Sequence, residues 1–240
     1  MIRLLSIIVP TLNEEMYIGR LLVSLAVQDF KDFELIIVDA DSSDLTKEKA
    51  KRYAGYFYID LKFVQANQKN ISLQRNMGAA VARGEKLVFA DADIELPTRN
   101  YLSRINRALA YRKSAAVLVR VRPELENFKD RMVSNFLNSL MLILNRIGIA
   151  NGRGAVIGAR ADEFRLIGGF NESMTVAEDV DLFMRMKKFG RMGIITTPVH
   201  ESPRRYRKKG YASIISIWII NGAWGFLFKK TLLSGWEDVR

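Results

Sequence analysis

The chain contains no cysteine and only one histidine among its 240 residues. It therefore cannot form disulfide bonds or a zinc site built on thiolates, and the lack of thiols fits a reducing compartment. With 49% hydrophobic and 26% charged residues, the composition is that of a globular protein and not of a disordered or fibrous one. The length suits an α/β domain with a substantial core.

The glycine signatures of two common nucleotide-binding classes are missing. A dinucleotide-dependent oxidoreductase needs Gly-x-Gly-x-x-Gly after its first strand, but this chain has Pro-Thr-Leu-Asn-Glu-Glu at residues 10–15. A P-loop NTPase is excluded because Gly78 and Gly84 are one residue too far apart and Glu85, not lysine, follows. Residues 10–15 also lack the glycines and arginines of a sugar nucleotidyltransferase.

Acidic residues are scarce relative to basic ones. Lysine and arginine outnumber aspartate and glutamate by 37 to 26, which gives a formal net charge of +11. This balance suits an anionic partner, such as nucleic acid, an acidic membrane surface or phosphorylated substrates, unless it is only a solvated basic surface. Much of the excess lies beside an apolar C-terminal segment and not among exposed aromatics, so we expect no nucleic-acid partner.

Apolar runs and helical patterns alternate through the first half of the chain. Short aliphatic runs predict strands at residues 4–9, 34–38, 57–64, 86–89 and 115–121, and helical patterns predict helices at 14–27, 44–53, 72–82 and 98–112. This alternation predicts an α/β fold, with a mostly parallel sheet covered by helices on both faces. Such sheets bind ligands beyond the carboxyl ends of their strands.

Other segments have less regular patterns. The run at 4–9 superficially resembles a signal peptide, but it is short and lacks a small-residue cleavage site, so we expect a first buried strand in a cytoplasmic protein. An apolar stripe at helical spacing runs from Met132 to Leu144, and residues 177–189 predict a helix that ends at Gly190.

Two acidic clusters directly follow predicted strands. The first contains Asp39, Asp41 and Asp44, and the second contains Asp91 and Asp93. In an extended chain, residues two apart face the same side, so the second pair can reach one ligand. Hard oxygen donors without histidine or cysteine beside them suit Mg²⁺ or Mn²⁺. The alternative is that these aspartates belong to turns and helix caps, which we favour for Asp44 because it precedes a predicted helix.

A third acidic group, Glu178-Asp179-Val180-Asp181, opens the helix predicted at 177–189. Acidic residues are favoured in a first helical turn by the helix dipole. Taken alone, that effect explains Glu178 and Asp181.

The order of these motifs is more specific than any one of them. Pro-Thr-Leu-Asn-Glu-Glu (10–15) follows the first predicted strand, and Val38-Asp39 lies at the end of the second. Two further motifs, Asn67-Gln68 and Ile-Ser-Leu-Gln-Arg-Asn-Met-Gly (71–78), precede Asp91-Ala92-Asp93. The motif Gly-Gly-Phe-Asn-Glu (168–172) then precedes Glu178-Asp179. The pattern, over roughly residues 4–205, resembles the inverting family 2 glycosyltransferases of the GT-A fold.

The resemblance implies a role for each matching residue. Those that would lie along the nucleotide sugar are Pro10, Thr11, Asn13 and Glu14, and those near the base are Asp39 and Arg75. Asp91 and Asp93 would bind the metal and the ribose, His200 would be another metal ligand, and Asp179 would be the general base. Ala40-Asp41 stands where the family often has Asp-Gly, which departs from the pattern at the base contact.

The implied activity is metal-dependent sugar transfer, of EC class 2.4, from a nucleotide-diphosphate sugar with Mg²⁺ or Mn²⁺. The charge that develops on the leaving diphosphate needs a cation, and an attacking hydroxyl needs a carboxylate to take its proton. The alternative is a catalytically silent nucleotide-sugar-binding or membrane-bound interaction subunit.

The C-terminal segment suggests a membrane. A basic cluster at 204–209 precedes eighteen uncharged residues, 211–228, which is at the lower limit for a membrane span. We expect a GT-A domain at 1–205 and membrane-associating helices at 206–240, with Trp218, Trp224 and Tyr211 at headgroup depth. A true span, a buried core helix and a homodimer through these helices remain alternatives.

A membrane-bound tail makes a lipid acceptor the expectation, either a polyprenyl phosphate or a lipid-linked glycan. The protein would then be cytoplasmic, peripheral or monotopic on the inner face of the cell membrane. A phosphate acceptor is already ionised, so Asp179 would orient it, whereas a hydroxyl acceptor would be deprotonated. The chain lacks a Gln-x-x-Arg-Trp motif, which argues against a processive polysaccharide synthase.

Overall fold

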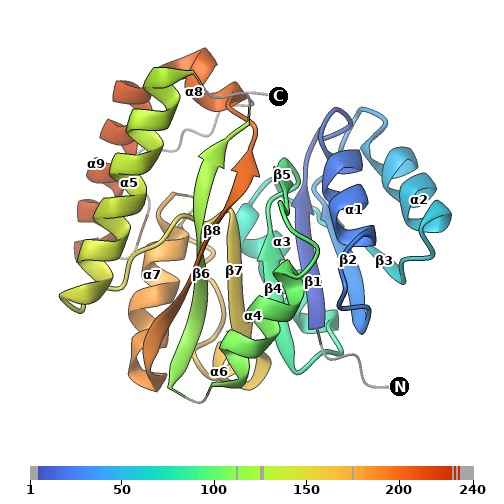
Figure 1. Cartoon of the computed structure of the whole chain (residues 1–240), viewed down its shortest axis with the longest axis horizontal. Helices are drawn as coiled ribbons and strands as arrows, with labels where there is room; N and C mark the ends of the chain where they lie inside the picture. Colours follow the sequence, from blue (N-terminus) through green and yellow to red (C-terminus); the bar gives the residue numbers. More distant parts are fainter. Residues whose placement is uncertain are drawn as a thin grey trace.

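The computed structural model describes residues 5–111, 113–124, 127–174, 176–228, 230 and 232 (Figure 1). The strands are β1 (Leu5–Thr11), β2 (Phe33–Asp39), β3 (Leu61–Gln65), β4 (Lys86–Ala90), β5 (Ile94–Glu95), β6 (Ser114–Pro123), β7 (Val156–Arg160) and β8 (Arg191–Glu201). The helices are α1 (Ile18–Ala26), α2 (Thr46–Tyr56), α3 (Ile71–Val81), α4 (Tyr101–Ala110), α5 (Phe128–Arg146), α6 (Ala161–Leu166), α7 (Glu178–Met186), α8 (Arg204–Lys209) and α9 (Tyr211–Phe228), with a 3₁₀ turn η1 (Lys187–Phe189).

The strands form one sheet in the order β3-β2-β1-β4-β7-β6-β8-β5. The pairs β3–β2, β2–β1, β1–β4 and β6–β8 are parallel, and β5 is antiparallel to β8. β7 is antiparallel to both β4 and β6. The sheet is therefore mixed. After α5 the chain returns to the edge where the parallel strands end, and there the Ala155 carbonyl accepts a hydrogen bond from the backbone N–H of Asp91. Because β7 begins at this edge, it runs in the opposite direction to β4.

Alternate side chains of the central strands face two separate cores. Ile7 of β1 belongs to one core and Ile8 to the other, as the two-residue period of a strand requires. The first core is covered by α1, α2 and α4, and the second by α3, α6 and α7. The expected α/β fold with helices on both faces is confirmed.

Most predicted elements lie within a few residues of their observed bounds. The strand expected at 57–64 is wrong at its start: Phe57 donates its backbone N–H to the Tyr53 carbonyl at the end of α2, and β3 begins only at Leu61. Asp44 lies at the start of α2, as expected, where its carboxylate accepts the Thr46 N–H at 3.0 Å. Parts of the predicted strand at 4–9, helix at 98–112 and tail at 206–240 lie outside the described residues, namely Leu4, Arg112, 229, 231 and 233–240.

Helices α5 and α9 form an outer layer, here called the α5–α9 layer, beyond α7 and the β6–β8 side of the sheet (Figure 1). The Tyr211 hydroxyl donates to Asp130 Oδ1 at 2.6 Å and so joins the start of α9 to the start of α5. Within the described residues, no helix combines the length and apolar character that a membrane crossing requires.

Candidate active site

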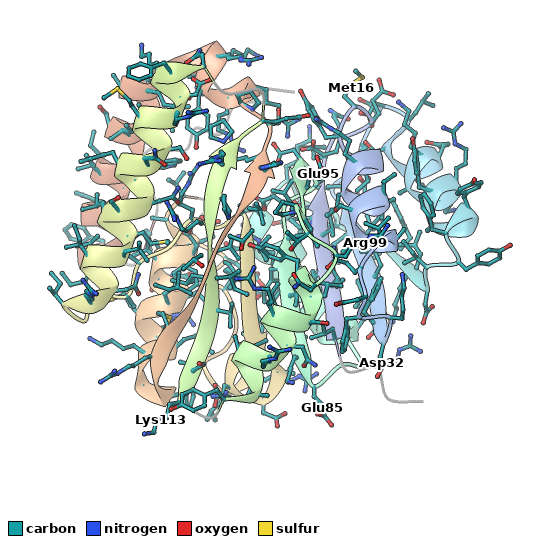
Figure 2. All side chains as sticks on the ribbon, viewed as in Figure 1. Met16, Asp32, Glu85, Glu95, Arg99 and Lys113 are labelled. Atoms are coloured by element: carbon teal, nitrogen blue, oxygen red, sulfur yellow. The ribbon has the colours of Figure 1, made fainter. Side chains whose placement is uncertain are left out.

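The candidate site lies at the carboxyl edge of the parallel strands. Figure 2 labels Asp32, Glu85 and Lys113, which precede β2, β4 and β6, at one end of the sheet, and Met16, which follows β1, at the other. The expected site residues lie at or near the Met16 end, where α/β sheets bind their ligands.

The loops after β1 and β2 are tied together around Asp39. This buried carboxylate accepts hydrogen bonds from the Thr11 hydroxyl at 2.8 Å and from the Ser42 backbone N–H at 2.8 Å. Thr11 and Asp39 face each other in the β1–β2 register, one pair after Pro10 and Val38. The pairing of neighbouring strand ends therefore places three of the expected donor-binding residues together.

Asn13 holds the same two loops in place. Its backbone adopts a left-handed conformation, with φ of 55°, which asparagine tolerates better than most residues. Its N–H donates to the Ser42 hydroxyl at 2.8 Å, and its side-chain oxygen accepts the Ser43 N–H at 2.9 Å. These bonds shape the surface that the resemblance assigns to the nucleotide.

Arg75 is the central cation of the site. It is only 1% exposed and donates to Asp91 Oδ1 and to Glu178 Oε1, both at 2.9 Å. Burial alone would lower its pKa, but the attraction of Asp91, Glu178 and Asp179 outweighs burial and raises the pKa. The structure thus places Arg75 on the carboxylates of β4 and α7, while Asp39 is bonded to Thr11 and Ser42.

Ala92 and Asp93 form a turn between β4 and β5, so the expectation that Asp91 and Asp93 lie in an extended chain is wrong. The two are nevertheless close enough to interact. Burial raises the pKa of Asp91, and the Asp93 charge adds to the rise while Arg75 opposes it. Asp93 pairs with a different arginine, Arg204, at 3.1 Å.

Asp179 is the second residue of α7, and the N-cap residue Ala177 adopts a left-handed φ of 61° just before the helix begins. Burial, together with the neighbouring Glu178 charge, raises the pKa of Asp179 to about 7, and Arg75 only partly opposes this rise. Gly154 faces this carboxylate, since a Cβ at that position would lie 3.1 Å from Asp179 Oδ2. A carboxylate with a pKa near neutrality is suited to accept a proton.

The sequence interpretation missed Arg204. Its guanidinium donates to Glu14 Oε1 at 2.7 Å, pairs with Asp93, and lies 4.3 Å from the centre of the Tyr17 ring. The available signal was its place in the basic cluster, which we assigned to lipid. Arg204 instead connects the end of β8 to the loop after β1.

Glu201, at the end of β8, was also missed. It accepts a hydrogen bond from Arg153 at 2.8 Å. Burial raises its pKa, and the charges of Asp93 and Asp91 add to the rise although Arg153 opposes it. We call Asp91, Asp93, Glu178, Asp179 and Glu201 the carboxylate cluster.

The carboxylate cluster suits a divalent cation in its donor chemistry. Burial raises the pKa of Asp91 and the nearby Asp93 charge adds to the rise, so a cation at this position would favour the ionised carboxylates. Hard cations bind through one or two carboxylates plus substrate phosphates. Across the described part of the chain, no three acidic or histidine side chains are already arranged to hold a metal. His200 lies one position from Glu201 on β8, and successive strand side chains alternate between faces, so its role as a ligand stays a prediction.

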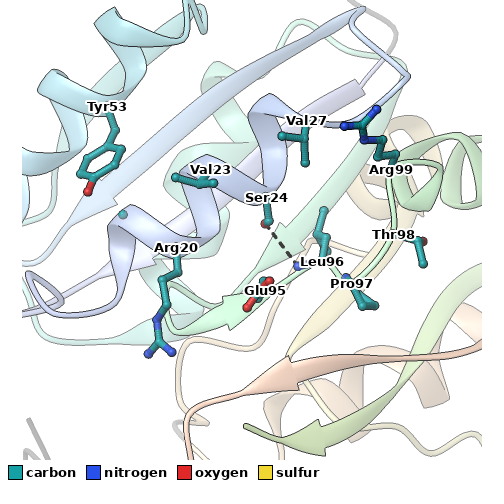
Figure 3. Close-up of a pocket in the computed structure, with 11 residues that line it drawn as sticks. Arg20, Val23, Ser24, Val27, Tyr53, Glu95, Leu96, Pro97, Thr98 and Arg99 are labelled. Atoms are coloured by element: carbon teal, nitrogen blue, oxygen red, sulfur yellow. Dashed lines mark hydrogen bonds between the residues drawn. The ribbon is translucent and has the colours of Figure 1, made fainter.

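A surface hollow of about 340 Å³ lies elsewhere, between α1, Tyr53 and the segment from Glu95 to Arg99 (Figure 3). The Leu96 N–H donates to the Ser24 hydroxyl at 3.2 Å along its wall. The hollow is lined by none of the expected site residues, so we do not assign the donor to it.

Comparison with known proteins shows the family and the fold class of the chain. The sequence model described as "Glycosyl transferase family 2" matches residues 6–167, and the chain belongs to this family. The fold is similar to that of the mannosyltransferase PcManGT from Pyrobaculum calidifontis in complex with GDP-Man and Mn²⁺, with a TM-score of 0.71, 22% identity, and coverage of 91% of this chain and 64% of that one. The expected family and GT-A-type fold are both confirmed.

Curated relatives match over shorter segments. The poly(ribitol-phosphate) β-N-acetylglucosaminyltransferase TarS of Staphylococcus aureus is 38% identical over 90 residues, which are 37% of this chain and 16% of that protein. The GalNAc(5)-diNAcBac-PP-undecaprenol β-1,3-glucosyltransferase of Campylobacter jejuni is 34% identical over 97 residues, or 38% of this chain and 30% of that protein. The matched segments thus span less than a third of either relative.

Proposed function

We propose that this chain is an inverting glycosyltransferase that moves a sugar from a nucleotide-diphosphate donor to a hydroxyl of a lipid-linked glycan. The observation that carries the proposal is Asp179, a partly buried carboxylate whose pKa is raised to about 7 and which interacts with Arg75 and Asp91. Inverting transfer to a hydroxyl needs such a base beside the attacking hydroxyl, on the side opposite the departing diphosphate.

The donor half of the reaction uses the first loops and the carboxylate cluster. Thr11, Asn13 and Asp39 line the end of β1 and β2 and would position the nucleoside. Asp91 and Asp93 would hold the cation, and a bound Mg²⁺ or Mn²⁺ supplies Lewis-acid stabilisation of the leaving diphosphate. The ion pair with Arg75 favours the ionised form of Asp91, although burial still raises the pKa of this carboxylate, and it fixes the position of Asp91 Oδ1.

The acceptor half uses Asp179. Its carboxylate would take the proton of the attacking hydroxyl as the oxygen bonds to the anomeric carbon and the diphosphate departs from the opposite side. A single in-line displacement of this kind inverts the anomeric centre. The ordinary pKa of an aspartate, about 3.9, would make it a much weaker base than one raised toward 7.

The lipid-linked acceptor is supported by two observations. The Campylobacter jejuni relative acts, by its name, on an undecaprenol-linked glycan. The chain also carries the basic and apolar segment of α8 and α9 beside the site, where Arg204 reaches Asp93. A polyprenyl phosphate would need no base, so the behaviour of an Asp179 variant separates the two acceptor types.

The experiment begins with a thermal-shift screen of nucleotide sugars, with Mn²⁺ and with chelator, because ligand binding to the folded state raises the unfolding midpoint. Transfer from the best donor to a lipid-linked glycan is then compared for wild type, Asp179→Asn and the control Asp162→Asn, whose side chain is fully exposed on α6. The proposal expects loss of transfer only in Asp179→Asn. Donor binding without transfer by wild type would instead support a silent binding subunit.

A further inference from the structure

Helix α5 packs with its polar side toward the protein. The buried residues of its inner side are Asp130, Ser134, Asn138 and Met141, which recur at helical spacing. The Ser134 hydroxyl and the Asn138 amide both donate to the Val121 carbonyl of β6, at 2.6 Å and 2.8 Å. An ordinary amphipathic surface helix is arranged the other way, with its apolar stripe on the core.

The exposed side of α5 carries an apolar stripe at three- and four-residue spacing, with the exposed polar residues Asn135 and Ser139 beside it. The exposed apolar residues are Phe128, Met132, Phe136, Leu140 and Ile143, followed by Ile147 and Ile149 after the helix. Phe128 and Phe136 are 78% and 64% exposed. Ile219, Ile220 and Phe228 of α9 are also exposed, so the apolar surface belongs to the α5–α9 layer as a whole. Contiguous apolar surface of this kind marks a site of interaction.

Among the described residues of α5, α8 and α9, the exposed charged residues are all basic. Exposed basic residues occur at both ends of α5 and in α8: Lys129, Arg131, Arg146, Arg207 and Lys208. The one acidic residue of α5, Asp130, is buried and bonded to Tyr211, and α9 contains no charged residue. Apolar residues bordered by cations complement an anionic lipid surface.

A second copy of the chain fits this surface less well. In a two-fold symmetric dimer the same patch meets itself, so the basic residues at the ends of α5 and in α8 would be brought toward a surface that carries the same charges. Anionic headgroups would neutralise those cations while the acyl chains cover Phe136 and its neighbours.

The α5–α9 layer is also connected to the active site. Tyr211 of α9 stacks on Tyr206, with ring centres 4.8 Å apart. The Tyr206 hydroxyl accepts from Arg153 at 2.6 Å, and Arg153 donates to Glu201 of the carboxylate cluster. A surface docked on lipid would therefore hold the acceptor side of the site beside the membrane.

We infer that the outer side of the α5–α9 layer docks on an anionic membrane surface through α5. The inference rests on the proposed function for its purpose, because a lipid-linked acceptor must be reached at the membrane. It assigns the main contact to the inverted helix α5, which the sequence interpretation had not connected with lipid.

The test uses the full-length protein and sedimentation with vesicles of phosphatidylcholine alone or with about one third phosphatidylglycerol. The variant Met132→Gln/Phe136→Gln/Leu140→Gln keeps good helix formers at exposed positions. The control Leu45→Gln/Tyr56→Gln/Tyr58→Gln removes three apolar residues around α2 that are together more exposed than the three of α5. Wild type and control should bind anionic vesicles, and the α5 variant should bind about a hundredfold more weakly.

A charge variant tests the second half of the inference. Lys129→Gln/Arg146→Gln should weaken binding to anionic vesicles about tenfold and leave binding to neutral vesicles unchanged. Equal sedimentation of wild type and the α5 variant would overturn the inference. So would a vesicle-free dimer of the wild type that the α5 variant converts to monomer, since a second copy would then be the occupant.

Failure of the proposed function gives a different result. Sugar transfer to a detergent-dispersed acceptor, measured in parallel, should be equal in wild type and the α5 variant. Vesicle binding that depends on α5 without any sugar transfer would support the docking surface and reject the proposed activity.

Discussion

The carboxylate cluster and the α5–α9 layer depart from the usual burial pattern in opposite directions. In the cluster, a fully buried arginine holds two carboxylates beneath the surface. In the layer, Phe136 faces solvent while Asn138, two residues away on the same helix, is buried. Folding stability alone favours neither arrangement. Burying charged groups costs desolvation free energy that ion pairs must offset, and apolar side chains left in water contribute no hydrophobic stabilisation. We therefore expect substitutions in the first region to change chemistry and those in the second to change docking.

The largest expected effect is that of Asp179→Asn. Loss of a general base should lower sugar transfer to a hydroxyl acceptor by about 10²- to 10⁴-fold, as measured by kcat/KM. The pKa of Asp179 is higher in the folded protein, at about 7, than in the unfolded chain. The free energy of unfolding therefore falls as the pH rises from the pKa of the unfolded chain to about 7, and the loss persists above that pH. The variant should thus match or exceed the wild-type unfolding midpoint at about pH 8. Wild-type turnover would remove Asp179 as the base.

A smaller loss should follow removal of the cation or of Asp93. Lewis-acid stabilisation is worth several kcal/mol, so chelator or Asp93→Ala should reduce transfer by about 10²- to 10³-fold. Mn²⁺ should restore the chelated wild type and not the variant. Full transfer in chelator would show that the arginines around Asp91 and Asp93 suffice without a metal.

A matched pair of truncations tests the contrast in stability. Ile105→Ala in α4, whose side chain lies in the core, should cost about 2–5 kcal/mol of unfolding free energy. Phe136→Ala in α5 should change it by no more than about 0.5 kcal/mol. Urea unfolding with unchanged m-values measures both. A large loss in Phe136→Ala would mean that this ring is covered by protein in solution.

A graded effect is expected from pH. Because the pKa of Asp179 is about 7 and the base must be unprotonated, kcat/KM should fall about tenfold per pH unit below that value and level off above it. A profile that stays flat down to about pH 5 would indicate that the titrating group is not required, as expected for a phosphate acceptor.

The local elements were largely predictable from the sequence. Strand periodicity and helix patterns lie in short windows, so β1, β2, β4 and most helices were located within a few residues. The end of α2 was missed because the aromatic run at 56–58 favours strand by propensity, while backbone hydrogen bonds extend the helix. The direction of β7 also depends on how the chain returns to the sheet.

The candidate site was predictable where motifs lie beside strands. Asp39 and Asp91 were proposed this way, and the parallel strand ends bring the loops that carry them to one edge. Asp179 opens the helix α7, and its role was implied by the family resemblance. Arg204 and Glu201 were not found, since they come from the far end of β8 and approach Asp93 only after the sheet has assembled.

The sequence by itself determined the family, the strand ends that carry the acidic residues and the amphipathic character of α5, because each depends on nearby residues. Only the tertiary structure decided which arginine faces which carboxylate and which side of α5 faces out. Pairing of charges and burial of a helix face are set by contacts between distant segments. The polar side of α5 turned inward because the Val121 carbonyl of β6 accepts its hydrogen bonds.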